Sequence, residues 1–520
     1  MAALPPEPLG DDAPVFRLPT RLSAARLAAA LGAAGYTVLQ SGGFRRRDLY
    51  LDTQDGRLHR AGLRLRRRDR HATWQLLEGG WVAAEQAATG EEAPGDGDVG
   101  APVAAVGGGR RLLPQATVHA SGKRLRLQTP VGAEIELEVA RWTFAAPDGG
   151  PPVAGPRIAM LERPSVPPAE AQHLAAVLRD LVRLRRLGAD ALATGLVALA
   201  LPLPGAPVPT GLRLEVSDTM AIAAPKILAR QAFKMWANTA GTIADLDPEF
   251  LHDLRVATRR ARSALRLLAP LYGDERCAAL RGALGWIAAA LGAVRDVDVH
   301  RQRIRAELER AGAAPGDDAG LAAALERQRG PALEALRAAL RSERHTDLVE
   351  ALRAMEVAAD AAPEAVAWGA APAVEVAPVL IARAAGRIRR WGDAIDAGTT
   401  NTDLHRLRIL FKRLRYTAEF FAELFGEPMR AAIARLVPYQ DCLGALQDAV
   451  VGLATLEEHV AVRTRRGRTR AGDLLVLGAL MQVQREEIAR QRGALARLWS
   501  SLPALVKALR RATSVPRITT

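Results

Sequence analysis

Two hydrophobic periods divide this chain into a strand-rich part and a helical part. Between about residues 15 and 200, Leu63 to Arg68 alternates apolar and basic side chains, and Ala133 to Val139 alternates apolar side chains with carboxylates. A period of two is typical of strands with one polar face. From Pro225 onward the chain consists of long amphipathic segments of Ala, Leu and Arg with few strand signals. The pattern predicts an α+β protein whose second part is all-α.

Shorter patterns predict boundaries within that plan. Leu22 to Leu31 and His173 to Leu187 have helical patterns, whereas Gly79 to Gly109, rich in Gly, Ala and acids, favours a mobile insertion. Four prolines between Leu201 and Pro209 indicate a linker. We therefore expect a β-rich domain at residues 15–200, a linker at 201–217 and a helical domain at 218–515.

The helical part contains one basic motif twice. Leu251 to Arg255 reads Leu-His-Asp-Leu-Arg, Leu404 to Arg408 reads Leu-His-Arg-Leu-Arg, and cations follow each at the same spacing. Steps of 3, 4 and 3 residues keep the aligned side chains on one helix face. Because lining up like charges stabilises a fold very little, a polyanionic ligand is the expected reason. The aligned residues are His252, Arg255, Arg259 and Arg262 in the first copy and His405, Arg408, Lys412 and Arg415 in the second.

The duplication extends well beyond this motif. Pro225 returns as Pro378 and His252 as His405, both at an offset of 153 residues (378 − 225 and 405 − 252). A Leu-Gly-Ala segment that begins at Leu291 returns at an offset of 152 (443 − 291). Internal repeats at about residues 224–300 and 377–452 indicate duplicated architecture. The period is too long for a solenoid, so we expect two pseudo-symmetric helical bundles.

Each motif helix carries an apolar stripe beside its basic stripe. A shift of one residue turns the basic stripe by about 100° from the apolar one, so the cations flank the buried seam and line a groove. The preceding helices carry Arg230, Lys234, Arg383 and Arg387 at matching positions. The apolar positions are Leu251, Leu254, Thr258, Ala261, Leu265 and Leu268, and Leu404, Leu407, Phe411, Leu414, Ala418 and Phe421.

Two interpretations of these cations are open: a solvated face of an arginine-rich protein, or a polyanion-binding surface. The duplicated register and the near absence of acids in the stripes favour binding. His252 and His405 either support or cap their helices or add a donor to a phosphate contact. The segments ending at Asp296 and Asp448 are expected to fix helix packing. The predicted polyanion-binding residues are Arg230, Lys234, His252, Arg255, Arg259, Arg260, Arg262, Arg383, Arg387, His405, Arg408, Lys412, Arg413 and Arg415.

Composition changes this picture only slightly. The net charge of +14 favours an anionic partner, although a GC-rich genome would also enrich Arg and Ala. Cys277 and Cys442 are the only cysteines, which suits a reducing cytoplasm and excludes a disulfide framework. Residues Met1 to Pro14 lack an apolar h-region, and no uncharged run of about 18 apolar residues occurs. Neither a signal peptide nor a membrane span is expected.

The helical part resembles the CHAD domain, the conserved-histidine α-helical domain. The resemblance rests on the two His-x-Leu-Arg helices, the two Leu-Gly-x-x-x-Asp segments and the long duplication, and it covers about residues 218–515. It implies two pseudo-symmetric four-helix bundles around a basic groove or pore. Members of this family bind inorganic polyphosphate, and some associate with polyphosphate or storage granules in bacteria. An arginine-lined groove suits such a polyanion because Arg pairs bidentately with phosphate oxygens.

The first domain resembles the CYTH domain, the triphosphate tunnel fold, through Tyr50 to Thr53, Ala61 to Arg67 and Trp74. The resemblance implies an eight-stranded tunnel that binds triphosphate and hydrolyses it with a divalent metal held by Glu-x-Glu strands. This chain departs from that pattern. Its early strand reads Val-Phe-Arg-Leu-Pro from Val15, with no acid, and its later strand has Glu162 alone.

The remaining tunnel residues define what that domain is expected to do. The arginines left to contact phosphate, unless they face solvent, are Arg64, Arg66, Arg124 and Arg126. The carboxylates left as metal candidates are Glu134, Glu136 and Glu138. Hard cations need several convergent oxygens, so little or no triphosphate turnover is expected.

Taken together, these patterns predict a polyphosphate-binding protein of the cytoplasm, with polyphosphate granules as a candidate location. A first alternative is an enzyme, an inorganic triphosphatase that uses Mg²⁺ or Mn²⁺; otherwise no cofactor is expected. A second alternative is a nonspecific nucleic-acid binder, which rests on charge alone. Aromatic residues are 4% of the chain, which argues against base stacking and makes nucleic acid a less favoured partner. No feature of the sequence sets the oligomeric state.

Overall fold

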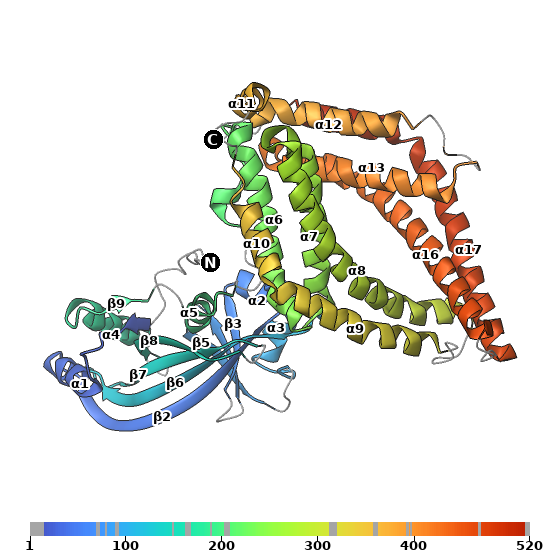
Figure 1. The fold of residues 1–520 in the computed structure, drawn as a ribbon. Helices are drawn as coiled ribbons and strands as arrows, with labels where there is room; N and C mark the ends of the chain where they lie inside the picture. Colours follow the sequence, from blue (N-terminus) through green and yellow to red (C-terminus); the bar gives the residue numbers. More distant parts are fainter. Residues whose placement is uncertain are drawn as a thin grey trace. The chain divides into compact units, whose positions relative to one another are not determined.

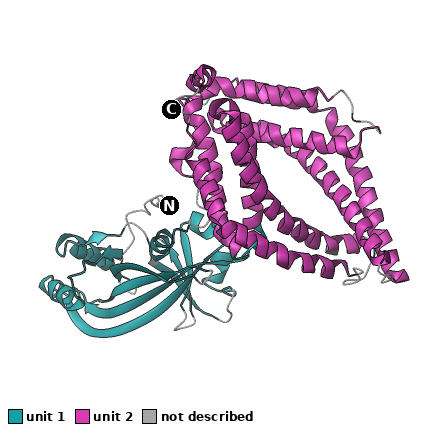
Figure 2. Ribbon diagram, viewed as in Figure 1, with its two compact units in different colours: residues 1–207, 244–249 teal, residues 208–243, 250–520 magenta. Residues whose placement is uncertain are grey.

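The computed structural model describes residues 15–514 apart from 69–72, 79–80, 89–92, 148–149, 162–167, 188–189, 202–207, 311, 313–319, 357–361, 392–394, 396–397 and 466–469. The chain divides into two compact units, Met1–Pro207 with Ala244–Glu249 and Val208–Ile243 with Phe250–Thr520 (Figure 2). The first unit is built around a sheet and the second is helical, which confirms the predicted α+β class. Residues 202–207 of the predicted linker lie outside the described residues, and a 3-10 turn, η1 (Thr210–Leu212), follows them.

Nine strands in the described part of the chain form one antiparallel sheet. They are β1 (Val15–Arg17), β2 (Thr37–Asp52), β3 (Leu63–Arg68), β4 (Thr73–Glu78), β5 (Trp81–Ala87), β6 (Leu113–Gln128), β7 (Glu134–Ala145), β8 (Val153–Leu161) and β9 (Arg185–Arg186). Their order is β5-β4-β3-β2-β6-β7-β8-β1-β9, and the long strands β2, β6 and β7 curl into a half-barrel (Figure 1). The two alternating segments of the sequence form β3 and β7, as predicted.

Five helices accompany the sheet in the described residues: α1 (Ala24–Ala33), α2 (Arg57–Arg60), α3 (Gly100–Gly107), α4 (Pro168–Asp180) and α5 (Ala191–Ala198). The predicted mobile insertion between Gly79 and Gly109 is wrong, because β5 and α3 lie within it. Val99 and Val103 are buried in a cluster with Trp74, which anchors this segment. The helix predicted from His173 ends at Asp180, because the following residues pair with β1 as β9.

The two faces of the curled sheet differ in chemistry because side chains alternate along each strand. Leu125 and Leu137 lie in a buried cluster with Leu27 of α1 and Leu174 of α4. The alternate positions of β6 and β7 carry charged side chains on the opposite face, among them the buried Glu138.

Helix α5 packs on the same face as Glu138, at the end where β7 becomes aromatic. Leu192 and Leu196 of α5 share a buried cluster with Trp142 and Phe144. Gly195 allows this approach, since a Cβ there would lie only 2.7 Å from the Phe144 ring. The charged side chains therefore lie beside an apolar, helix-covered end of the half-barrel.

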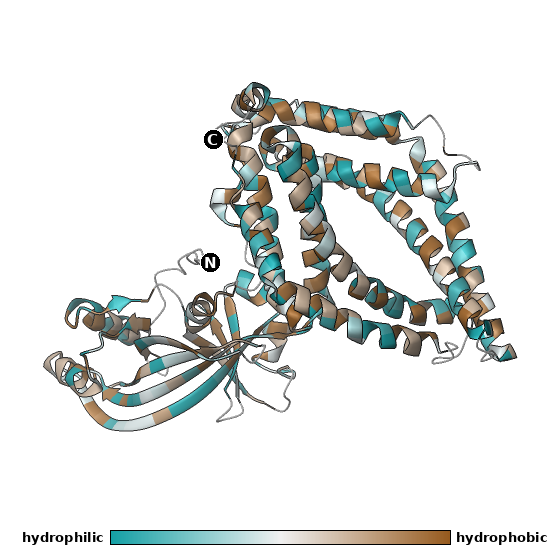
Figure 3. Cartoon of the chain, viewed as in Figure 1, coloured by the Kyte–Doolittle hydropathy of each residue, from teal (hydrophilic) through white to brown (hydrophobic). Residues whose placement is uncertain are grey.

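The second unit contains the remaining helices (Figure 1). They are α6 (Met220–Ile243), α7 (Pro248–Tyr272), α8 (Asp274–Arg310), α9 (Leu321–Arg341), α10 (Glu343–Arg353), α11 (Pro363–Ala370), α12 (Ala373–Arg389), α13 (Asn401–Phe420), α14 (Ala422–Phe425), α15 (Glu427–Ala434), α16 (Val437–Arg465), α17 (Ala471–Trp499) and α18 (Leu502–Ala512). Figure 3 shows hydrophilic positions interleaved with hydrophobic ones along the long helices. This interleaving is the amphipathic pattern from which the helical region was predicted.

One hydrophobic core joins both copies of the repeat. Leu254, Leu265 and Leu291 of the first copy belong to the same buried cluster as Leu407 and Leu443 of the second. Burying each such side chain stabilises the fold by about 1.5–3 kcal/mol, so the two copies depend on each other for stability.

The far ends of two helical hairpins also meet. Ile304 and Leu308 of α8 and Leu325 of α9 form a second buried cluster with Leu456 of α16 and Leu480 of α17. Within the described residues, α8 alone is long and apolar enough to cross a membrane. Its side chains Leu284, Ile287 and Leu291 are fully buried in the helical core, so its apolar face is already covered by protein.

Candidate functional site

Side-chain caps fix the first turns of the two motif helices. In α13, Oγ1 of Thr400 accepts a hydrogen bond from N of Asp403 at 3.1 Å, and the Asp403 carboxylate bonds back to Thr400. In α7, Oδ1 of Asp247 accepts from N of Glu249 at 2.8 Å. Such caps each stabilise a helix start by about 1 kcal/mol. They set the register in which each basic stripe emerges.

The stripes lie as the sequence predicts. Every position of both apolar stripes is buried. The basic stripes flank them: His252, Arg255, Arg259 and Arg262 are half-buried, as are Arg408, Lys412 and Arg415, whereas His405 is exposed. The cations therefore border the buried seam between helices rather than pointing away from it.

Four of these cations meet between α7 and α13. We call Arg255, Arg259, Arg408 and Lys412 the central basic cluster. Burial lowers the pKa of Lys412 to about 7, and the nearby charges of Arg259, Arg408 and Arg255 lower it further. Burial likewise lowers the pKa of Arg408, where Arg259 and Arg255 act in the same direction and Asp448 opposes them. The fold thus holds like charges close together in a partly dehydrated place.

Residues of the Leu-Gly-Ala segments border this cluster. Asp296 of α8 forms an ion pair with Arg255 at 3.6 Å, and Oε1 of Gln447 in α16 lies 2.8 Å from Nδ1 of His405. Asp448 raises the pKa of Arg408 and of Lys412. These contacts agree with the packing role predicted for both segments, and the cations of the central cluster outnumber the two aspartates.

The low pKa of Lys412 gives a first prediction about stability. Its ordinary pKa is 10.5 and its folded pKa is about 7, so between these values the unfolded chain holds a proton that the folded chain lacks. The free energy of unfolding should therefore rise with pH across this window. Changing Lys412 to Met should remove that part of the slope and stabilise the protein at pH 7. Chemical denaturation at several pH values measures both effects.

A matched control for this prediction is Lys507→Met on the exposed face of α18. That change should leave the pH slope as it is in the unchanged protein. An identical slope in the Lys412 variant would show that Lys412 is protonated throughout this window.

One end of the α7–α13 contact is neutralised by an acid that the sequence interpretation missed. Glu419 of α13 forms ion pairs with Arg260 of α7 and, at 2.6 Å, with Arg415. The guanidinium of Arg260 also lies 5.5 Å from the ring centroid of Tyr416. The spacing of Arg415 and Glu419, four residues apart on one helix, was a signal for their pairing. Arg260 and Arg415 thus have an internal anion.

The flanking helices treat their cations differently. Arg230 of α6 forms an ion pair with Glu423 at 2.7 Å and also donates to O of Leu212 at 2.6 Å. The pKa of Lys234 is lowered by burial and then by Arg260 and Arg230. On α12, the matching residues Arg383 and Arg387 are exposed.

The other end of the α7–α13 contact gathers arginines. Arg262 and Arg266 of α7 lie with Arg413 of α13 and Arg281 of α8, which we call the four-arginine cluster. Burial lowers the pKa of Arg266, and Arg413, Arg281 and Arg262 lower it further. Arg266 and Arg281 were not among the predicted residues, because neither belongs to the repeated spacing.

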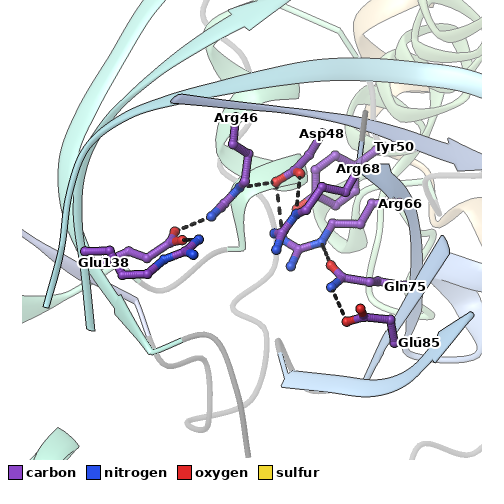
Figure 4. A network of polar contacts seen from close by, with 9 residues as sticks. Arg46, Asp48, Tyr50, Arg66, Arg68, Gln75, Glu85 and Glu138 are labelled. Atoms are coloured by element: carbon purple, nitrogen blue, oxygen red, sulfur yellow. Dashed lines mark hydrogen bonds and ion pairs between the residues drawn. The ribbon is translucent and has the colours of Figure 1, made fainter. Parts of the chain in front are cut away.

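The half-barrel contains a separate, buried charge network (Figure 4). Asp48, with 1% of its surface exposed, accepts hydrogen bonds from Nε of Arg46 at 2.7 Å and Nε of Arg68 at 3.1 Å. Arg66 lies 3.5 Å from the same carboxylate and donates to Oε1 of Gln75 at 2.8 Å. On β2, Arg46 and Asp48 are two residues apart and so share one face.

Glu138 is the second carboxylate of this network. It forms ion pairs with Arg46 and, at 2.7 Å, with Arg124. The predicted tunnel arginines Arg66 and Arg124 thus face the same interior, together with Arg46 and Arg68, which the sequence interpretation missed. Because the partners come from different strands, no local spacing reveals them.

The other predicted tunnel residues lie outside this network. Nε of Arg64 lies 2.8 Å from Oδ2 of Asp190, at the start of α5. Nε of Arg126 donates to Oε2 of Glu134 at 2.7 Å, and both side chains are exposed. Glu136 lies 3.8 Å from Arg124.

The carboxylates proposed as metal candidates therefore contact arginines. No group of three or more His, Cys, Asp or Glu side chains in the described residues has the arrangement of a metal site. Glu162 lies outside the described residues.

Residues 226–457 match the family model of the CHAD domain. The helical region therefore contains a CHAD domain, and the resemblance stated for that part of the chain is confirmed.

The chain is also similar to uncharacterized proteins from two strains of Mycobacterium tuberculosis, with 31% identity over 274 residues. This match covers 50% of this chain and 49% of the relative, so the chain spans about half the length of the curated relatives it matches. Among solved structures, the CHAD domain from the plant Ricinus communis is 26% identical with a TM-score of 0.45, covering 60% of this chain and 98% of that one. PptA from Streptomyces chartreusis is 19% identical with a TM-score of 0.42, covering 54% and 99%.

Proposed function

We propose that this protein binds inorganic polyphosphate through the central basic cluster of its CHAD domain. The observation that carries the proposal is the convergence of Arg255, Arg259, Arg408 and Lys412 from both copies of the repeat. Their mutual repulsion and burial depress the pKa of Lys412 to about 7. A phosphate chain would relieve that repulsion and accept charge-assisted hydrogen bonds from three guanidinium groups.

The surroundings of the cluster favour a polyanion without bases. Tyr416 is the aromatic side chain beneath the cluster: it is buried, with the guanidinium groups of Arg259 and Arg260 over its ring. Its ring is therefore covered and offers no platform for a nucleobase. An unbranched phosphate chain needs only the cations.

The decisive experiment is a competition between long-chain polyphosphate and DNA for the full-length protein. The two competitors are matched in phosphate concentration at physiological salt. We expect polyphosphate to displace a labelled polyphosphate probe far more efficiently than DNA does. We also expect affinity to fall steeply with salt, because binding releases counterions from the polymer. Equal displacement by both polymers would make the surface a general polyanion binder.

A consequence for location follows from the proposed function. In a cell that stores polyphosphate as granules, a protein with this surface would gather at the granule. A fluorescent fusion should then colocalise with stained granules, and charge reversal in the central basic cluster should disperse it.

For the half-barrel we propose a degenerate triphosphate tunnel that serves as a scaffold. Its support is the network in which Asp48 and Glu138 hold the guanidinium groups of Arg46, Arg66, Arg68 and Arg124. A triphosphate that entered would have to displace these internal carboxylates. Because they already supply negative charge at hydrogen-bond distance, only weak phosphate binding is expected there.

A further inference from the structure

The contacts between α7 and α13 obey an exchange rule. Arg260 pairs with Glu419, while Arg266 is acted on by Arg413. The partners are equivalent at one offset, since 413 − 260 and 419 − 266 are both 153. Contacts that exchange in this way are what a two-fold axis between two elements produces. The two ends of the contact are therefore counterparts of each other.

The two ends are filled differently. At one end, the carboxylate of Glu419 lies between Arg260 and Arg415 and beside the ring of Tyr416. At the other end, the same offset places Arg266 at the position of Glu419 and Ser263 at the position of Tyr416. A carboxylate is thus replaced by a cation, and a large ring by a hydroxymethyl group.

The second end therefore has cations without their anion. Arg413 and Arg262, the counterparts of Arg260 and Arg415, flank Arg266, and α8 adds Arg281. Across the described part of the chain, none of these four guanidinium groups makes a hydrogen bond or an ion pair. The Nε atoms of Arg262 and Arg413 are buried without a hydrogen-bond partner there. Unsatisfied buried donors are costly, so their retention indicates a ligand.

We infer that the four-arginine cluster binds one phosphate oxyanion, in the place that the Glu419 carboxylate occupies at the opposite end. Four forked guanidinium groups suit a tetrahedral oxyanion, which accepts several hydrogen bonds at once. The oxyanion is either free phosphate or one unit of a phosphate chain. A chain held at the central basic cluster would extend toward this end, because Glu419 repels it from the other. That direction rests on the proposed function, whereas the phosphate site itself does not.

The test is Arg266→Glu in the full-length protein, which restores a carboxylate between Arg262 and Arg413. In chloride buffer, we expect this variant to melt at a higher temperature than the unchanged protein. Inorganic phosphate at matched ionic strength should raise the melting temperature of the unchanged protein by about 2 °C or more and leave the variant where it is. The control Arg353→Glu, on the exposed end of α10, should respond to phosphate as the unchanged protein does.

Retention of the phosphate response by the Arg266→Glu variant would overturn the site. If that variant fails to fold, Arg413→Gln provides the same phosphate comparison with a smaller change. Polyphosphate affinity tests the direction of the chain: Arg266→Glu should weaken it about tenfold, as loss of one charge-assisted contact does. Unchanged polyphosphate affinity would refute the direction. Loss of polyphosphate binding on charge reversal at the central basic cluster, with the phosphate response intact, would separate the two sites.

Discussion

Reversing the charges of Arg259, Arg408 and Lys412 together should lower the affinity for long-chain polyphosphate by roughly a hundredfold or more. Each of these side chains would lose a charge-assisted contact worth about 1.5 kcal/mol or more, and the new carboxylates would repel the chain. The salt dependence should also weaken: log K against log salt should become shallower by roughly 2, as for about three fewer neutralised phosphates. Binding isotherms at several salt concentrations measure both quantities.

The matched control reverses Arg327, Arg353 and Arg510, three exposed arginines on α9, α10 and α18. It changes the net charge by the same amount, so it isolates position from bulk charge. We expect the control to weaken binding by much less than the cluster variant. If the two variants lose affinity alike, long-range attraction accounts for binding and the cluster is no site.

Changing Asp48 to Asn should destabilise the half-barrel by about 3–5 kcal/mol. Asp48 is 1% exposed and its carboxylate lies within 3.5 Å of nitrogen atoms of Arg46, Arg66 and Arg68. Removing its charge leaves buried cations that repel one another without a counterion. Chemical denaturation of the full-length protein, followed by the fluorescence of the buried Trp74 and Trp142, should show an earlier transition.

The matched control is Asp180→Asn at the surface. Asp180 also bonds an arginine, Arg179, at 2.7 Å, but both side chains are more than half exposed. Exposed pairs contribute about 0–1 kcal/mol, so this change should have little effect. Tripolyphosphate should partly restore the Asp48 variant, because it supplies the missing negative charge. Equal stability of the two variants would show that the arginines of the network are solvated.

The two copies of the repeat illustrate how far local sequence carries the prediction of a site. The spacing of His252, Arg255 and Arg259 fixes their common face, because an α-helix turns by the same angle at every residue. The position of each basic stripe beside a buried apolar stripe follows from the same geometry. That these cations bind polyphosphate stays a prediction until the affinities are measured.

Which cations have partners is not local information. Arg260 is neutralised by Glu419, although 159 residues separate them, and Arg266 meets another arginine at the equivalent place. The sequence shows Glu419 only as an acid beside Arg415. Its bond to Arg260 exists because α7 packs against α13, which no residue spacing within one helix specifies.

The half-barrel shows the same division. Alternation along β3 and β7 is set by the extended backbone, so the sequence by itself determined the strands, the α+β class and the duplicated basic stripes. Only the tertiary structure decided that Asp48 and Glu138 meet arginines of other strands, and that one end of the α7–α13 contact has a carboxylate while the other has four arginines. Periodicity is a property of the local backbone, whereas charge compensation depends on which elements pack together.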